Sequence, residues 1–439
     1  MKISKSLKMQ DRAAKNIPGM CQLLSKRPDM FSQGVWPGYY SKAKGAYVWD
    51  LDGNKYLDMS ISGIGAAVLG YADDEVDDAV KEAITNGVVS SLNCSEEVEL
   101  AELLCELHPW ADKVRYSRSG GEAMGIAVRI ARAHTKRNVI AFCGYHGWQD
   151  WYLAANLGTG NELNEYLIEG LSPAGVPSSL SKTNFPFRYN HIEDLEQIVS
   201  ENGKDLAAIV MEPVRNMEAS EGFIENIREI ANKTGAVLIM DEISAGFRIN
   251  TGGAHLIKHT VTPDIAVFSK AMGNGYAISA VIGIEKIMES AQKSFISSTH
   301  WTERIGFVAA LATIKKHHRE NVSEHLIRIG AIVMKAWHEL GKKYELNVHV
   351  GGMEPMGHFV IEYEDFPSIK ALYIQEMIDQ GILASNLFYV NYAHTEEHAI
   401  RYIEAADKAF KVISESIKNN DIASRLRGKP AQTGFKRIN

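Results

Sequence analysis

Few cysteines and no long apolar run mark this sequence, and each scarcity excludes a class of protein. The four cysteines among 439 residues, Cys21, Cys94, Cys105 and Cys143, stand far apart and form no CxxC pair. They predict neither a disulfide framework nor a zinc site, and we expect them to be reduced and mostly buried. No window holds the roughly 18 apolar residues that a membrane span needs, and the N-terminus lacks the apolar core of a secretion signal. We therefore expect a cytoplasmic protein.

The sequence also has no large excess of positive or negative charge. The formal net charge is −7, with 23% charged and 45% apolar residues, which is ordinary for a globular chain. A chain of 439 residues can bury a large core, so we expect one large domain with smaller additions. The composition favours a small-molecule partner over nucleic acid or a membrane.

Short apolar runs in the middle of the chain predict a parallel sheet. From about residue 120, helical stretches alternate with the runs NVIAF (138–142), LAAIVM (206–211), GAVLIMDEI (235–243) and DIAVFS (264–269). Continuous apolar runs suit strands that crossover helices cover on both faces. Earlier in the chain, Asp52, Gly53 and Asn54 form a predicted hairpin turn, and Ser95 is a predicted helix N-cap. The predicted fold class is α/β.

Ligand sites in parallel sheets form where strands end, so the residues after these runs are the first candidates. Ser119, Gly120 and Gly121 precede an Ala-rich helix, whose first N–H groups and dipole favour an anion. A helix cap without a ligand explains these residues equally well. Tyr145 stands between two glycines beside His146, either as a platform for a flat ring or as ordinary packing.

Two further predicted strands end in charged residues. Asp241 and Glu242 lie at the end of the run 235–243, where a carboxylate needs a partner to stay ionised unless it caps a helix or is exposed. Lys270 follows the run 264–269 and stands alone among apolar residues. Such a lysine is exposed, paired with an acid, or consumed as a nucleophile. An anion cradle, an aromatic plate, a carboxylate and a lysine are the partners that pyridoxal phosphate requires.

With these residues the chain resembles the fold-type I, class III family of pyridoxal-phosphate-dependent aminotransferases, in the branch of glutamate-1-semialdehyde 2,1-aminomutase. The resemblance runs from about Lys44 to about Ile413. It rests on motifs in the family's order, namely KGAYVWDLDGNKYLD, ELAELL, SGGEA, YHG, MEPV, DEISAGFR, TPDIAVFSKAMGNG and AHTEEH. It implies a large cofactor-binding domain at 76–310, with a mostly parallel sheet flanked by helices, and a smaller α+β domain formed by 1–75 and 311–439.

The resemblance also implies roles for single residues. Lys270 would form the Schiff base with pyridoxal 5'-phosphate and move the substrate's α-proton, and Asp241 would keep the pyridine nitrogen protonated. Tyr145 would stack on one face of the ring. The catalytic and cofactor-binding residues that it implies are Ser119, Gly120, Gly121, Tyr145, His146, Glu212, Asp241, Ile243, Lys270 and Thr299. No metal ligand is among them.

Three segments bear on assembly and substrate. In this family a threonine of the partner subunit completes the phosphate site, so the resemblance implies a homodimer with Thr299 in that role. The loop after Thr299 reads THWTER, which departs from the family's wording. The aminomutase's carboxylate-binding arginine has no counterpart in FSQGVWPGYYSKAKG, and its SWGP segment is replaced by SGIGAA. Both departures argue against the aminomutase's own substrate.

The predicted reaction is a ping-pong transfer of an amino group from a donor such as glutamate to a carbonyl acceptor. Polar and aromatic residues of two loops suit a keto- or aldehydo-sugar, as in amino-sugar biosynthesis, although packing at a dimer seam explains them as well. These residues are Trp148, Gln149, Asp150, Trp151, His300, Trp301 and Glu303. The alternative functions are an intramolecular aminomutase and, less favoured because Lys270 and Asp241 are present, a cofactor-fold protein without catalysis.

Some charged residues have no assigned part in this chemistry. The histidines of HTEEH, His394 and His398, are expected to cap a surface helix rather than bind metal. His317 lies in a basic helical run and is expected to be solvated. The candidates for clamping a donor carboxylate are Arg188, Arg215 and Arg248, each of which could instead pair with an acid such as Glu212 or Glu242.

Overall fold

The computed structural model describes residues 2–158, 160, 162–164, 169–214 and 216–432. The chain divides into two compact units, one formed by 74–323 and the other by 1–73 together with 324–439. The predicted domain boundary at 310 falls inside helix α10 (Arg304–Arg319), which continues within the first of these units.

The unit 74–323 is built around a seven-stranded sheet with the order β4-β10-β9-β8-β7-β5-β6. Strand β10 runs antiparallel to its neighbours β4 and β9, and the remaining pairs are parallel. The strands are β4 (Lys113–Ser117), β5 (Val139–Cys143), β6 (Asn184–Pro186), β7 (Leu206–Met211), β8 (Val237–Asp241), β9 (Ile265–Phe268) and β10 (Ser279–Gly283). Strands β5, β7, β8 and β9 are buried throughout, as the apolar runs predicted.

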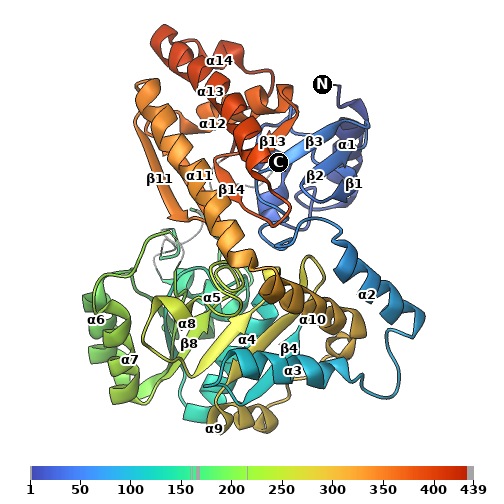
Figure 1. Ribbon diagram of the computed structural model, residues 1–439. Coiled ribbons are helices and arrows are strands. Elements are labelled where there is room, and N and C mark those ends of the chain that lie inside the picture. The colour runs from blue at the N-terminus through green and yellow to red at the C-terminus, as the bar shows by residue number, and fades with distance from the viewer. Residues whose placement is uncertain (1, 159, 161, 165–168, 215, 433–439) are drawn as a thin grey trace. The chain divides into compact units, whose positions relative to one another are not determined.

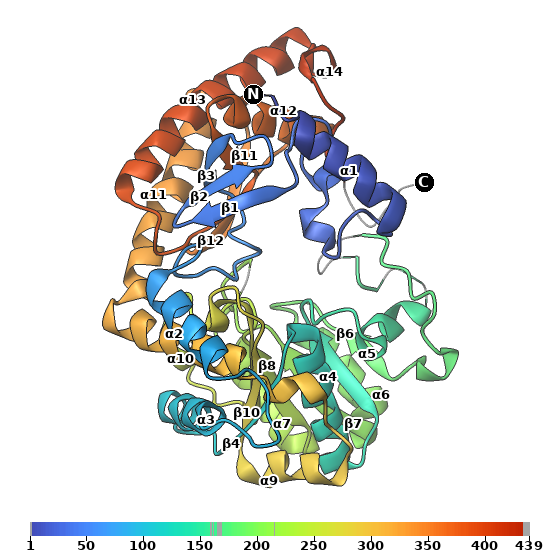
Figure 2. The ribbon, with the colours of Figure 1, turned by 90° about the vertical axis from the view of Figure 1, so that its right-hand side faces the viewer.

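Helices cover this sheet. Helix α4 (Gly120–Thr135) packs across strands β4, β7, β8, β9 and β10, and α6 (Ile192–Asn202) lies beside α7 (Phe223–Thr234) (Figures 1 and 2). Helix α10 packs against α2 (Asp74–Thr85) and α3 (Glu96–Leu107). The short helices are α5 (Asp150–Leu153), α8 (His255–Lys258) and α9 (Glu285–Met288). The core between α4 and the sheet is apolar, because the Ala and Ile side chains of α4 meet the strand residues there.

The second unit joins the two ends of the chain. The predicted hairpin is present as β2 (Tyr47–Asp50) and β3 (Lys55–Met59), and the sheet order is β1-β2-β3-β13. A three-stranded sheet has the order β11-β12-β14. Its other elements are α1 (Ser4–Asn16), β1 (Tyr40–Lys44), α11 (Val322–Lys343), β11 (Val348–Met353), β12 (Met356–Ile361), α12 (Phe366–Asp379), β13 (Ile382–Ala384), β14 (Leu387–Tyr389), α13 (Glu396–Asn419) and α14 (Ile422–Arg425).

The segment SGIGAA of this unit has an unusual backbone. Four successive residues have positive φ angles, +41° at Ser62, +68° at Gly63, +61° at Ile64 and +74° at Gly65. A β-branched residue rarely adopts this conformation, so Ile64 is under local strain. The Ser62 hydroxyl donates to the Tyr389 carbonyl at 2.7 Å and helps to hold the turn.

Several local predictions were wrong. Ser95 precedes α3 in a helical conformation and its side chain makes no capping hydrogen bond. The four cysteines are free, but only Cys143 is buried, because the other three lie on partly exposed parts of the chain. His317 is fully buried, since it falls on the inward face of α10.

Three buried histidines couple folding to pH. Burial lowers the pKa of His108 and of His317 to about 4, and that of His394 to about 3. His108 Nε2 accepts a hydrogen bond from the Gly253 N–H, and His394 Nδ1 accepts one from the Asn391 N–H, each at 3.0 Å. A proton on either accepting nitrogen would break its bond, so these rings fold in the neutral form.

Acidification is therefore expected to destabilise the fold. Between pH 6.5 and 4 the unfolded chain binds a proton at each of these histidines and the folded chain does not, so stability falls as the pH falls. Each ring lowers the free energy of unfolding by about 1.4 kcal/mol per pH unit in this window. Urea unfolding at pH 7 and pH 5 measures the slope. His317→Gln should reduce this slope by about 1.4 kcal/mol per pH unit, the contribution of one proton. An unchanged slope would contradict the assignment of His317.

Candidate active site

Most of the predicted site residues lie at the carboxyl ends of neighbouring strands. Ser119 follows β4, Tyr145 and His146 follow β5, Glu212 follows β7, Asp241 ends β8 and Lys270 follows β9. Polar groups at this edge of a parallel sheet converge on one region, where the strands stop and the loops begin.

Asp241 and His146 form a buried pair. The Asp241 Oδ2 and His146 Nδ1 atoms are 2.8 Å apart, and both side chains are almost fully buried. The other oxygen, Oδ1, accepts from the Ile243 N–H at 3.0 Å, and His146 Nε2 lies 3.2 Å from the Cys143 carbonyl. Both ring nitrogens thus lie within hydrogen-bonding distance of an oxygen atom, which fixes the orientation of the ring. The pair thus holds an oriented carboxylate at the end of β8.

Lys270 begins the short helix η6 (Lys270–Gly273) in the left-handed backbone region, with φ +42°. Non-glycine residues rarely occupy this region, and such outliers cluster at functional sites. Its Nζ atom donates to the Ser244 hydroxyl at 2.6 Å. Ser244 lies three residues after Asp241, so this contact brings the lysine to the end of β8. Sequence reasoning missed Ser244, although it is part of the quoted DEISAGFR motif.

The start of α4 forms a backbone cradle. The N–H groups of Arg118 and Ser119 donate to the Glu122 carboxylate at 3.0 and 3.1 Å. No hydrogen bond among the described residues uses the N–H groups of Gly120 and Gly121, which remain available at the positive end of the helix. A Cβ atom on Gly120 would lie 2.8 Å from the Ile243 side chain, so only glycine lets these two predicted residues meet.

The loop after β5 is held by Glu212. The Glu212 carboxylate accepts from the Tyr145 N–H at 3.2 Å. Gly144 has φ +121°, and a Cβ atom there would lie 2.6 Å from Glu212 Oε2. The Tyr145 ring packs edge-on against Tyr152, with ring centroids 5.8 Å apart. The predicted role of Tyr145 as a plate for a flat ring stays a prediction.

Arg118 ties three segments of the unit together. Its Nε atom donates to the His300 carbonyl at 2.7 Å, and its terminal nitrogens donate to the carbonyls of Trp301, Glu303 and Ala277. The guanidinium therefore joins the start of α4, the stretch that follows η6, and the loop that begins at Thr299. Thr299 itself is exposed in η8 (Thr299–Thr302), and its predicted service to a partner subunit stays a prediction.

Loss of the Arg118 fork should loosen the site as a whole. Arg118→Met leaves several carbonyls without donors, and we expect the free energy of unfolding to fall by about 2–4 kcal/mol, since hydrogen bonds to charged groups are worth about 1.5–3 kcal/mol each. Arg118→Lys keeps the charge but not the fork, and should recover less than half of the loss. Urea unfolding measures both. The matched control is Arg129→Met, inside α4, where the guanidinium makes one such bond to a backbone carbonyl; equal effects at both positions would argue against the clamp.

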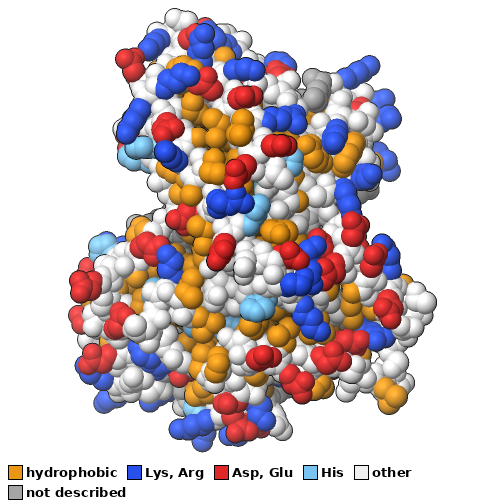
Figure 3. Space-filling view, viewed as in Figure 1, with side chains coloured by type: hydrophobic (Ala, Val, Ile, Leu, Met, Phe, Trp, Pro, Cys, Tyr) orange, Lys and Arg blue, Asp and Glu red, His pale blue; other side chains and the backbone are white. Residues whose placement is uncertain are grey.

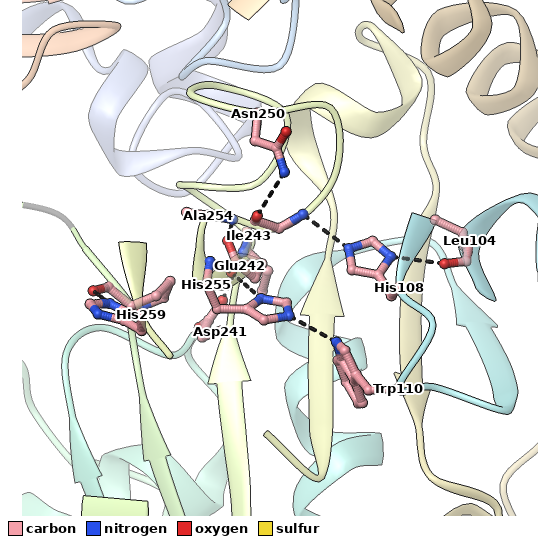
Figure 4. A network of polar contacts seen from close by, with 12 residues as sticks. Leu104, His108, Trp110, Asp241, Glu242, Ile243, Asn250, Ala254, His255 and His259 are labelled. Atoms are coloured by element: carbon pink, nitrogen blue, oxygen red, sulfur yellow. Dashed lines mark hydrogen bonds and ion pairs between the residues drawn. The ribbon is translucent and has the colours of Figure 1, made fainter. Parts of the chain in front are cut away.

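A second buried network supports the end of β8 (Figure 4). His255 Nδ1 donates to Glu242 Oε1 at 2.7 Å, and the same carboxylate accepts the N–H groups of Ala254 and His255. Trp110 Nε1 donates to His255 Nε2 at 3.0 Å. Because indole can only donate, His255 Nε2 is an acceptor. The Glu242 carboxylate thus positions the loop before α8. Among the described residues its hydrogen bonds are to Ala254 and His255, and not to an arginine as the predicted alternative had it.

The three candidate arginines differ. Arg188 forms a bidentate pair with Asp194 at 2.8 and 2.9 Å on the surface. Arg248 is fully buried. Arg215 lies outside the described residues.

The predicted acceptor lining is also divided. Trp151 is buried in the core, Trp301 packs against that core, and the Glu303 side chain caps α10 by accepting from the Ile305 N–H at 2.7 Å. These three side chains have contacts within the chain itself, and the predicted alternative of packing at a dimer seam stays a prediction. Trp148 is 70% exposed, and Asp150 and His300 are exposed as well. Space-filling Figure 3 shows basic and acidic side chains interspersed over one face, as the modest net charge implies.

Two kinds of feature are absent from the described residues. No cluster of three or more histidine, cysteine or acidic side chains could hold a metal ion there. In the same part of the chain, no helix has the length and apolarity required to span a membrane.

The arrangement defines a fold-type I pyridoxal-phosphate-dependent enzyme, and comparison with known proteins gives its family. Residues 31–410 match the class III aminotransferase family. The chain is 31% identical to the 3-aminobutyryl-CoA aminotransferase of Cloacimonas acidaminovorans, over 95% of this chain and 99% of that protein. It is 33% identical to a glutamate-1-semialdehyde 2,1-aminomutase of Lachnoclostridium phytofermentans, over 90% and 96%. The chain therefore belongs to the class III aminotransferases.

Solved structures support the fold. The FumI protein of Sphingopyxis sp. MTA144, in its pyridoxal-phosphate form, superposes with a TM-score of 0.85 at 23% identity, covering 98% of this chain and 99% of that one. The cofactor of the family is pyridoxal 5'-phosphate, and the residues present fit it. The free N–H groups and close glycines at the start of α4 suit its phosphate, and the Asp241 carboxylate and Lys270 amine suit its ring nitrogen and aldehyde.

Proposed function

We propose that this protein is a transaminase that moves an amino group from an amino-acid donor, glutamate, to a carbonyl acceptor by a ping-pong mechanism. The observation that carries the proposal is the meeting of Lys270 Nζ with Ser244 Oγ, three residues from the buried Asp241–His146 pair. When bound, the cofactor supplies an electron sink for the carbanion that forms when the donor loses its α-proton. Lys270 would hold the cofactor through its amine and, once the donor's amino group has displaced it, would take and return that proton.

The other residues bind and orient. Asp241 would place its carboxylate against the ring nitrogen, and His146 keeps that carboxylate oriented. The N–H groups of Gly120 and Gly121 hold the phosphate, with Ser119 beside them. The faces of the ring would meet Tyr145 and Ile243. His146, Glu212 and Thr299 complete the proposed site, the last from a partner subunit of a cytoplasmic homodimer.

For the acceptor we propose a polar carbonyl compound of the keto- or aldehydo-sugar class. Its support is the exposed polar and aromatic set Trp148, Asp150 and His300 near the proposed phosphate cradle. Isothermal titration calorimetry would compare the affinity for such sugars with the affinity for simple keto acids and for a 3-oxoacyl thioester. The last is the class that the name of one relative indicates. No preference for sugars would overturn this part of the proposal.

A second candidate is an intramolecular aminomutase, favoured by the names of relatives that are 33% identical. Against it stand the absence of arginine from FSQGVWPGYYSKAKG and the altered SGIGAA segment, whose backbone is a strained left-handed turn. An aminomutase would release no external keto acid.

The deciding experiment incubates the purified, cofactor-loaded protein with glutamate and measures 2-oxoglutarate and the visible spectrum. Stoichiometric 2-oxoglutarate with a spectral change supports amino transfer. A cofactor band that glutamate leaves unchanged, with alanine and other amino acids also inactive as donors, overturns it in favour of the aminomutase. The same spectra of Lys270→Ala provide the negative control.

A further inference from the structure

Gln149 has an unexplained environment beside the cradle. Its amide is wedged between two glycines: a Cβ atom on Gly121 would lie 2.6 Å from Gln149 Nε2 and 2.8 Å from Oε1, and one on Gly147 would lie 2.7 Å from Oε1. The Cα atom of Gly121 would also lie only 3.1 Å from that Cβ of Gly147. The three residues therefore form one tight contact in which glycine is required twice to seat one glutamine.

The amide is poorly satisfied where it lies. Gln149 Oε1 is fully buried and has no hydrogen-bond partner among the described residues. Buried polar atoms of native proteins are almost always paired, and exceptions point to a functional group or an absent ligand. The amide leans on the first turn of α4, whose Gly120 and Gly121 N–H groups are the proposed phosphate donors.

We propose that Gln149 is a further cofactor-binding residue, whose Nε2 donates a hydrogen bond to the phosphate at the start of α4. The inference rests on the proposed position of the phosphate there. Because the phosphate accepts hydrogen bonds, the amide nitrogen must be the atom that faces it, and Nε2 is the amide atom nearest to the Cβ position of Gly121. The cost of leaving Gln149 Oε1 without a partner is then offset by the hydrogen bond from Nε2 of the same amide to the phosphate.

The test compares pyridoxal 5'-phosphate with pyridoxal, which lacks the phosphate, by equilibrium dialysis against cofactor-depleted full-length protein. Gln149→Glu keeps the size of the side chain but puts a carboxylate against the phosphate, and Gln149→Met removes the donor. We expect Gln149→Met to bind pyridoxal phosphate about 10-fold more weakly, in line with one charge-assisted hydrogen bond, and Gln149→Glu more weakly still. Pyridoxal should bind both variants within threefold of the natural chain.

A matched control is Gln197→Glu, the same substitution on the exposed face of α6. It should change neither affinity. Equal loss of pyridoxal and pyridoxal phosphate in the Gln149 variants would reduce Gln149 to a packing residue and overturn the inference, as would no loss of either. A failure of transamination with the phosphate selectivity intact would overturn the proposed function and leave this inference standing.

Thermal unfolding of the cofactor-free proteins separates binding from folding. Removing a buried oxygen that lacks a partner should not harm the fold, so cofactor-free Gln149→Met is expected to melt at or above the temperature of the natural chain. A residue kept only for structure would give a lower melting temperature together with weaker binding, and that result would also overturn the inference.

Discussion

Lys270→Ala is expected to lower the rate of amino transfer from glutamate by at least about 10²–10⁴-fold, the range that a positioned acid–base group typically contributes. The proposed mechanism also gives the lysine the covalent attachment of the cofactor, so reduction with borohydride followed by mass spectrometry should find the cofactor on Lys270 of the natural chain and nowhere on the variant. Rapid-quench measurement of 2-oxoglutarate gives the rate.

Two comparisons make the Lys270 result specific. Lys286→Ala changes an exposed lysine of α9 and should leave the rate unaltered. A small amine such as methylamine, added to Lys270→Ala, should recover part of the rate by supplying a base. A Lys270→Ala variant that retains more than a tenth of the natural rate would exclude Lys270 from the chemistry.

Asp241→Asn is expected to lower the rate by about 10²–10³-fold, the loss typical when one preorganised electrostatic group is removed from an active site. The amide keeps the size of the side chain but carries no charge to pair with the ring nitrogen. Its NH₂ group, if placed at the Oδ2 position, can no longer accept a hydrogen bond from His146 Nδ1. Single-turnover rates with glutamate measure the effect, and the cofactor absorbance should shift because the ring nitrogen loses its counter-charge.

The control for Asp241 lies at the opposite end of the sheet. Asp205 immediately precedes β7, where it accepts hydrogen bonds from the N–H and side chain of Asn138. Asp205→Asn should lower stability slightly and leave the rate within threefold. If both aspartates proved equally dispensable, the assignment of Asp241 to the ring nitrogen would fail.

The positions of the main candidate residues could be predicted from the sequence, because buried parallel strands consist of continuous apolar runs. Asp241 and Lys270 end or follow such runs, and the structure has them at strand ends. The contacts between them were beyond prediction. Ser244 reaches Lys270 only through the turn after β8, and the carbonyl groups that Arg118 holds come from loops far along the chain.

The burial of His317 is explained by the face of α10 on which it lies. His317 stands in the charged run KKHHR, yet it follows Ile314 by three residues and Phe307 by ten, which places it on the buried stripe of α10. Counting from the apolar residues of the helix would have placed it inside. The glycines at 121 and 147 are different, because their requirement comes from the side chain of Gln149 and no local pattern reports it.

The parallel pairing of β3 with β13 also determines when this sheet can be completed during synthesis. Leu57 aligns with Ile382, so the strand that completes this sheet leaves the ribosome only after the whole of 74–323. The contiguous unit can collapse as it emerges, whereas the N-terminal hairpin must wait with one edge of β3 open. Open strand edges invite pairing with other chains. The free edge of β3 is therefore open to such pairing until β13 has emerged.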